Sequence, residues 1–111
     1  MGKKSTDAAE ELLLKKITDH LKSHNLHGLR GEVVPTKRKI GGEVVNFIPD
    51  LYIPEVEIPV ELTVDKDRDD DYLSVGLLPM VVTESRMRFD TVEEYVDSFL
   101  DFHKKWKDSR I

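Results

Sequence analysis

The feature that most constrains the fold is the alternation of apolar and polar residues between positions 56 and 64. One side of this segment carries only aliphatic side chains: Val56, Ile58, Val60, Leu62 and Val64. A period of two residues indicates a β-strand with one buried face. Glu61 belongs to the opposite face, and Thr63 shares that face. Pro59 lies within the run and has no backbone N–H, so we expect an edge position or a bulge at that point.

A second carboxylate precedes this strand at the end of another apolar run. Asp50 directly follows Pro49, and Glu61 comes 11 residues after Asp50 (61 − 50). If the two runs form adjacent strands, their carboxylates can converge on one metal ion. A hard divalent cation prefers carboxylate oxygens and usually keeps several water molecules. The spacing therefore predicts a site for such a cation at Asp50 and Glu61.

Helical periodicity marks the two ends of the chain. Apolar residues recur at helical spacing over 7–26, where Asp7 and Glu10 form an approximate capping box. Glu10 and Glu11 lie in the first turn, where a carboxylate also interacts favourably with the helix dipole. The last helix begins at Thr91 with a second capping box, and its wide apolar stripe indicates core packing.

The segments between these helices predict a mixture of strands and one short helix. We expect a β-hairpin over 29–48, with strands at 29–34 and 43–48 joined by a turn at 36–42. The turn carries three consecutive cations, Lys37, Arg38 and Lys39. They could contact phosphate groups or form a solvated turn, and both alternatives remain open.

A short helix follows at 67–75, with Gly76 at its end, and a continuous apolar run at 77–83 indicates a strand buried on both faces. A helix that connects two strands of one sheet makes a βαβ crossover. The strands at 56–64 and 77–83 should therefore be parallel.

The length of 111 residues is enough to close one hydrophobic core, and we expect a single domain over 1–111. The chain has no cysteine, which excludes disulfides and cysteine-based zinc sites. No apolar run approaches the ~20 residues of a membrane span. The N-terminal residues also lack the apolar core of a signal peptide. We therefore expect a soluble cytoplasmic protein without membrane contact.

The net charge of −5 is distributed unevenly. Residues 1–49 carry nine basic and six acidic side chains, a net +3, whereas residues 50–111 carry eight and sixteen, a net −8. Nucleic-acid backbones are bound by basic surfaces, so such a contact would use the first half of the chain. Charge alone favours a simpler interpretation, in which the acidic half keeps the protein in solution.

Three histidines lie near the end of the first predicted helix: His20, His24 and His27. His20 and His24 are four residues apart and share a helix face, which is a spacing suited to zinc. The residues between them lack the glutamate of the metalloprotease motif. We interpret the three histidines as polar surface, with a metal site as the alternative.

Several short motifs follow one another in a recognisable order. They are Thr6–Glu10, Asp50-Leu-Tyr-Ile-Pro-Glu55, Val60-Glu-Leu-Thr63 and Arg68-Asp-Asp-Asp-Tyr-Leu-Ser-Val-Gly76. Together they cover most of the chain and resemble the PD-(D/E)xK restriction-endonuclease-like superfamily. The closest likeness is to its Vsr-like branch of small nucleases, of the very-short-patch-repair type. This resemblance implies an α/β fold with a mixed four-stranded sheet flanked by helices, in the order α-β-β-β-α-β-α.

The resemblance also implies roles for particular residues. Asp50 and Glu61 would be the catalytic carboxylates that hold Mg²⁺ or Mn²⁺, and Glu10 or Glu11 would be an accessory acid. Thr63 occupies the position where the superfamily has lysine and this branch has an acidic residue. Threonine supplies no positive charge and no base near pH 7. The chain also lacks the Gly and His that follow in the Vsr-like pattern, and these departures affect the expected catalysis rather than the fold.

The function implied by the resemblance is metal-dependent hydrolysis of DNA phosphodiesters. Lys37, Arg38, Lys39 and Lys66 would hold the DNA backbone. Related enzymes often work as dimers, so a homodimer is also expected. The alternative is a catalytically inactive nuclease-fold protein that serves as a nucleic-acid-binding or protein-binding module.

Overall fold

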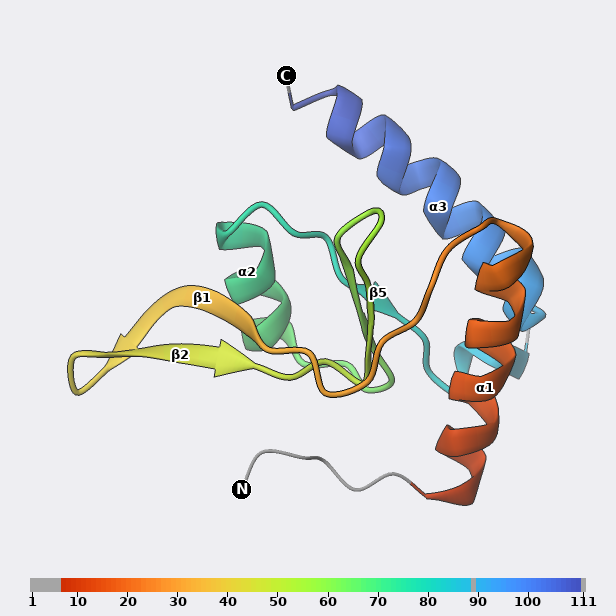
Figure 1. The fold of residues 1–111 in the computed structure, drawn as a ribbon, viewed down its shortest axis with the longest axis horizontal. Coiled ribbons are helices and arrows are strands. Elements are labelled where there is room, and N and C mark those ends of the chain that lie inside the picture. Colours follow the sequence, from red (N-terminus) through yellow and green to blue (C-terminus); the bar gives the residue numbers. More distant parts are fainter. Residues whose placement is uncertain (1–6, 89, 111) are drawn as a thin grey trace.

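The fold combines helices with two small β-sheets (Figure 1), as seen in a computed structural model that describes residues 7–88 and 90–110. The helices are α1 (Ala8–Ser23), α2 (Lys66–Ser74) and α3 (Val92–Asp108), with a 3₁₀ turn at Arg86–Arg88. The strands are β1 (Val34–Ile40), β2 (Glu43–Phe47), β3 (Leu51–Ile53), β4 (Ile58–Glu61) and β5 (Met80–Val81). The predicted mixed α/β class is confirmed.

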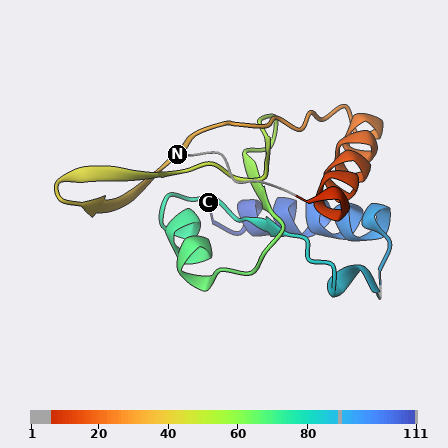
Figure 2. The same ribbon diagram turned by 90° about the horizontal axis from the view of Figure 1, so that it is seen from below.

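The strands do not form the single four-stranded sheet that we expected. In the described part of the chain, β1 and β2 form a separate two-stranded sheet, and β3, β4 and β5 form a three-stranded sheet with β4 in its centre. Figures 1 and 2 show the β1–β2 hairpin extending away from the helices α1 and α3. The return strand predicted at 43–48 is confirmed as β2, which ends at Phe47, and β3 begins as a separate strand four residues later (51 − 47).

The three-stranded sheet is mixed, as predicted. Strand β4 pairs antiparallel with β3, where Leu51 lies opposite Val60. It pairs parallel with β5, where Val60 lies opposite Met80. Helix α2 connects β4 to β5, so the expected βαβ crossover is confirmed.

Pro59 lies in the central strand, so the predicted edge position is wrong. The structure shows why proline fits there. Tyr52 exchanges both of its backbone hydrogen bonds with Leu29, at 2.8 Å each, which makes the Tyr52–Pro59 pair across β3 and β4 a non-hydrogen-bonded one. On the other side of β4, the pairing with β5 begins only at Val60. The missing N–H of Pro59 therefore costs the sheet no hydrogen bond.

The first hairpin strand is also displaced from its predicted position. Strand β1 does not end before Pro35 but runs through it to Ile40, with an irregular register between Pro35 and Lys39. The two-stranded sheet has no third strand among the described residues, and an edge strand tolerates proline. The turn is formed by Gly41 and Gly42 alone, whose φ angles of 61° and 84° suit glycine.

The predicted helix starts are confirmed. Glu10 N donates to Asp7 Oδ1 at 2.8 Å, and Asp7 N donates to Glu10 Oε1 at 3.3 Å, which is a complete capping box at α1. At α3, Glu94 N donates to the Thr91 side chain at 3.1 Å. Both contacts satisfy backbone N–H groups that have no partner inside the helix.

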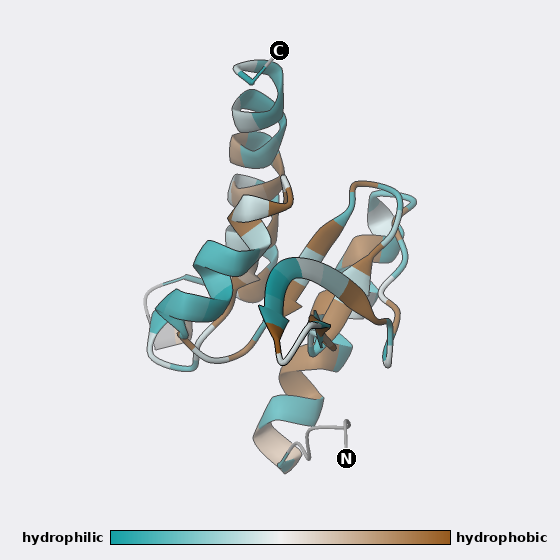
Figure 3. Cartoon of the chain, turned by 90° about the vertical axis from the view of Figure 1, so that its left-hand side faces the viewer, coloured by the Kyte–Doolittle hydropathy of each residue, from teal (hydrophilic) through white to brown (hydrophobic). Residues whose placement is uncertain are grey.

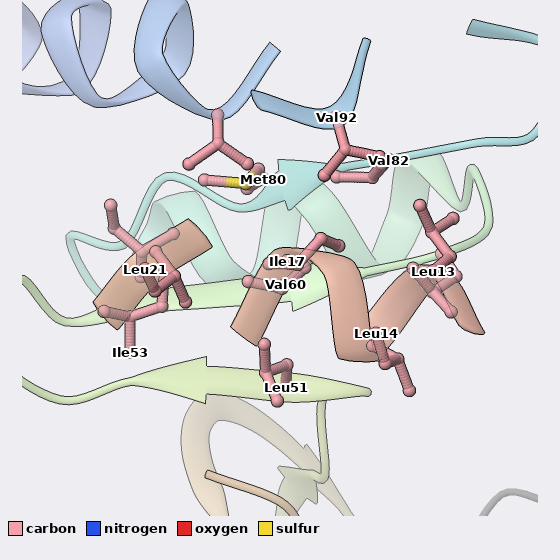
Figure 4. Packing of buried hydrophobic residues seen from close by; sticks show 13 residues of the cluster. Leu13, Leu14, Ile17, Leu21, Leu51, Ile53, Val60, Met80, Val82 and Val92 are labelled. Carbon is pink, nitrogen blue, oxygen red and sulfur yellow. The ribbon is translucent and has the colours of Figure 1, made fainter. Parts of the chain in front are cut away.

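The main hydrophobic core lies where α1 and α3 pack on one face of the three-stranded sheet (Figure 4). Its buried residues are Leu13, Leu14, Ile17, Leu21, Leu51, Ile53, Ile58, Val60, Leu62, Met80, Val82, Val92 and Val96. Successive side chains of a strand point to opposite faces, so Glu61 is directed away from this core. The opposite face lies toward α2, a short and largely hydrophilic helix (Figure 3).

A core truncation tests this packing. Ile17→Ala removes a side chain that is 0% exposed, and we expect the free energy of unfolding to fall by about 2–5 kcal/mol. Leu12 lies on the same helix but is 55% exposed, so Leu12→Ala should change the free energy of unfolding by less than about 1 kcal/mol. Urea unfolding followed by circular dichroism measures both values, and equal losses would contradict the proposed core.

A pH effect should arise from His103, a buried residue of α3 that lies between the rings of Phe99 and Trp106. Burial, followed by the charge of Lys107, lowers the pKa of His103. The unfolded chain therefore binds this proton at a higher pH than the folded protein does. The stability that depends on neutral His103 is complete above its ordinary pKa of about 6.5 and is lost as pH falls toward the folded value.

We expect the unfolding free energy to decrease between about pH 7.5 and pH 5.5, and to decrease less in His103→Gln. Urea titrations of both proteins at the two pH values measure the difference. This comparison separates His103 from the other histidines, which are the same in both proteins. Equal changes in the two proteins would show that His103 does not titrate as described.

Candidate functional site

The candidate site lies where β3 begins and β4 ends. The register of these strands sets Leu51 opposite Val60 and Tyr52 opposite Pro59, and one further step sets Asp50 opposite Glu61. Directly opposed residues share a face and have Cβ atoms about 4.5–5.5 Å apart. Both carboxylates are buried, with 8% of Asp50 and 4% of Glu61 exposed. The fold thus brings the two acids singled out by the sequence to one place.

Glu61 is held by two donors from α2. Arg68 Nε and the Tyr72 hydroxyl each donate to Glu61 Oε2 at 2.7 Å. Burial raises the pKa of Glu61 above its ordinary value, and the nearby charge of Asp50 adds to the increase, while Tyr72 and Arg68 oppose it.

The partners of Glu61 are themselves fixed in position. Arg68 Nη2 donates to the backbone oxygen of Ile48 at 3.0 Å, and its guanidinium lies 4.3 Å from the centre of the Phe47 ring. Tyr72 is completely buried, and its ring contacts Phe47 edge to face. Burial and the bond to Glu61 raise the pKa of Tyr72 far above its ordinary value, so its hydroxyl remains a donor.

Asp50 is oriented by the chain that follows β4. Its Oδ2 accepts a hydrogen bond from the backbone N–H of Leu62 at 2.9 Å. Arg30 forms a two-point ion pair with Glu11, at 3.0 and 2.9 Å. This bond to Glu11 raises the pKa of Arg30 against its desolvation, and the charge of Asp50 contributes further. Arg30 therefore lies within the electrostatic range of both Glu11 and Asp50.

Two of the remaining predicted site residues, Glu10 and Thr63, line a groove beside the start of α1. This groove has a volume of about 540 Å³, and Glu10, Thr63 and Glu84 are among its lining residues. Strand β4 ends at Glu61, so Thr63 lies beyond it and is exposed. Glu10 is already used in the capping box of α1. Of the two candidate accessory acids, Glu11 is the one tied through Arg30 to the surroundings of Asp50.

The predicted phosphate contacts lie on β1 and α2. Arg38 Nε forms an ion pair with Asp71 Oδ2 at 2.9 Å, which joins the hairpin to α2. Lys37 and Lys39 flank Arg38 on the same strand and are exposed, and Lys66 is exposed as the first residue of α2. Lys37, Arg38 and Lys39 therefore lie on strand β1 rather than in the turn that the sequence predicted.

Comparison with known proteins gives no further identification. No protein-family model, no curated protein and no solved structure matches the chain. Within the described residues, no helix has both the length and the apolar character needed to cross a membrane. The resemblance of the motifs to nucleases therefore remains an interpretation of the sequence.

The sequence analysis placed Arg68 and Tyr72 in one motif of the resemblance, but it assigned no role in the site to them or to Arg30. The sequence does contain a signal for Arg68 and Tyr72. They are four residues apart and therefore share one face of a helix. That helix, α2, covers the sheet face that carries Glu61. Arg30 had no such signal. Its contact with Glu11 joins residues that are 19 positions apart, and only the folded chain brings them together.

The contacts of Glu61 can be tested by removing its donors. Arg68→Met should lower the free energy of unfolding by roughly 3 kcal/mol, because it leaves a buried carboxylate without its cation. Tyr72→Phe should lower the free energy of unfolding by about 1–3 kcal/mol, because the hydrogen bond to Glu61 is lost. Arg38→Met is the control, since its pair with Asp71 is partly exposed and should contribute less than about 1 kcal/mol.

Urea unfolding at neutral pH measures these values. In the double variant with Glu61→Gln, the loss caused by Arg68→Met should become smaller, because no charge then remains to be compensated. If Arg68→Met and Arg38→Met lower the free energy of unfolding by the same amount, the buried pair of Arg68 and Glu61 does not stabilise the fold as described.

Proposed function

We propose that the protein is a divalent-cation-dependent DNA endonuclease whose cation is held by Asp50 and Glu61. The observation that carries the proposal is the buried pair of carboxylates, with Asp50 directly before β3 and Glu61 at the end of β4, one position beyond the Leu51–Val60 pair on each strand. Two acids so placed repel one another, and the charge of Asp50 contributes to the raised pKa of Glu61. A cation between them would remove this repulsion.

The donor atoms fit Mg²⁺ or Mn²⁺. Carboxylate oxygens are the ligands that these hard cations prefer, and the remaining coordination positions are usually filled by water and substrate phosphate. In the described part of the chain, both side-chain hydrogen bonds of Glu61 fall on Oε2. Its Oε1 is therefore the oxygen that would contact the cation. The Leu62 N–H fixes the direction of the Asp50 carboxylate.

A bound cation would supply an activated water molecule and neutralise negative charge on the phosphate. The chain itself would orient the two carboxylates and place positive charge near the scissile group. Arg68 and Tyr72 hold Glu61 in one conformation, and Arg30 lies within electrostatic range of Asp50. Because Thr63 offers no base near pH 7, the proton of the attacking water would have to leave through solvent or substrate.

DNA contact would involve the basic side of the hairpin. Lys37 and Lys39 are exposed on β1, and Lys66 is exposed at the start of α2, which packs against β1 (Figure 1). Exposed lysines bind the phosphate backbone without reading sequence. Arg38 is engaged with Asp71, so we assign it to the hairpin–α2 contact before any contact with DNA.

A second candidate function is DNA binding without cleavage. The ion pair of Glu61 with Arg68, at 2.7 Å, favours it, because the arginine already supplies a positive charge to this carboxylate. The threonine at position 63 favours it as well, since the superfamily pattern has a charged side chain there. In this case Asp50 and Glu61 would stabilise the fold, and the exposed lysines would bind DNA.

Cleavage assays separate the two functions. With Mg²⁺ or Mn²⁺, we expect the protein to cleave at least one of duplex, single-stranded, flap or junction DNA. Asp50→Asn and Glu61→Gln should each lower the rate by at least about 100-fold, because a metal ligand stabilises the transition state by several kcal/mol. Glu57→Gln is the matched control: Glu57 is exposed at the far end of β4, and its variant should cleave like the wild type.

Circular dichroism should verify that each variant is folded. Absence of cleavage with all four DNA forms and both cations would refute the endonuclease. DNA binding that weakens with salt but produces no cleavage would then support the second candidate.

A further inference from the structure

A second cluster of potential metal ligands lies apart from the carboxylate pair, between α1 and α3. His20 lies in the last turn of α1, His24 caps the C-terminal end of that helix, and Asp97 comes from α3. Their ligand atoms all lie within 4.8 Å of one another. Both imidazoles approach the same oxygen, with Nε2 of His20 at 2.8 Å and Nε2 of His24 at 2.7 Å from Asp97 Oδ1.

We propose that His20, His24 and Asp97 form a zinc-binding site that joins α1 to α3. The i, i+4 spacing places the two imidazoles on one helix face, and α3 supplies a carboxylate opposite them. Two histidines and one carboxylate, with water in the fourth position, are a ligand set that zinc accepts. The proposal is independent of the endonuclease, since it uses other residues and another class of cation.

The distances require only a small adjustment. Zinc binds imidazole nitrogen and carboxylate oxygen at about 2.0–2.2 Å, which places tetrahedral ligands about 3.3–3.5 Å apart. The present nitrogen–oxygen separations are shorter than this by roughly half an ångström, a change that side-chain rotation can supply. The two rings are already nearly perpendicular, at 77°, with centres 5.2 Å apart, so neither ring blocks the other.

The environment also favours a bound cation. The hydrogen bonds from His20 and His24 lower the pKa of Asp97, so its carboxylate is charged at neutral pH. The side chain of His20 is 18% exposed, that of His24 39% and that of Asp97 53%, so a hydrated ion can reach the cluster from solvent. Zinc bound at Nε2 would leave the single proton of each neutral imidazole on Nδ1, and three coordinate bonds would take the place of two hydrogen bonds across the helix interface.

The choice of zinc follows from the ligands. Imidazole nitrogen binds borderline metals such as Zn²⁺, Ni²⁺ and Cu²⁺ more strongly than Mg²⁺ or Ca²⁺. The site should therefore ignore Mg²⁺ at concentrations that would fill the carboxylate pair of Asp50 and Glu61. This difference allows the two proposed sites to be measured separately in one protein.

Isothermal titration with ZnCl₂ tests the proposal on the full chain, without a histidine tag and in chelator-treated buffer. We expect one zinc ion per chain at micromolar concentrations. His20→Gln, His24→Gln and Asp97→Asn should each weaken binding by more than about tenfold, since even the loss of an outer-shell partner costs 10–100-fold. His27→Gln is the matched control, because His27 pairs with Glu55, outside the cluster, and binding should persist.

Two further measurements do not depend on the His20, His24 and Asp97 variants. Zinc should raise the melting temperature of the wild type by several degrees at saturation, and MgCl₂ should not reproduce this rise in the Asp50→Asn variant. Zinc should also shift the imidazole resonances of His20 and His24, but not those of His27, in NMR spectra. Absence of saturable binding up to millimolar zinc, or equal binding by the wild type and the three ligand variants, would overturn the proposal.

Discussion

The structure depends on the two-sided burial of the central strand β4. Val60 and Ile58 face α1 and α3 and are completely buried in the hydrophobic core. Glu61, next to Val60 in the sequence, faces the other side and is almost equally buried. A buried carboxylate is costly unless it is hydrogen-bonded and paired. Helix α2 meets this requirement through Arg68 and Tyr72, so the position of α2 and the chemistry of Glu61 depend on each other.

This arrangement explains why a short, strongly acidic helix is held in place. Helix α2 has Tyr72 as its one buried residue, and its other residues are mostly hydrophilic. Its attachment rests on polar contacts to Glu61 and Ile48, on the Phe47 ring, and on the Arg38–Asp71 pair. The same contacts that stabilise the fold also hold one of the two candidate metal-binding carboxylates in position. Fold and proposed function therefore share these residues.

Much of the local structure follows from sequence patterns. The helix starts at Asp7 and Thr91, the crossover through α2 and the apolar alternation around Val60 were all predictable, because capping and periodicity act over a few residues. The hairpin was misplaced, because Pro35 was taken as a strand end although an edge strand accepts proline. Pro59 was assigned to an edge for the same local reason, whereas its lack of an N–H is harmless only because of where the neighbouring strands begin.

By itself, the sequence determined the secondary-structure types, the buried face of β4 and the identity of Asp50 and Glu61 as the acids to examine. These depend on residue spacing along one segment. Only the tertiary structure decided that the strands divide into two sheets and that Arg68 and Tyr72 bind Glu61. It alone placed Asp97 beside His20 and His24, which are more than 70 positions away in the chain. Such contacts depend on how helices and strands pack across the core, and no spacing within a single segment encodes them.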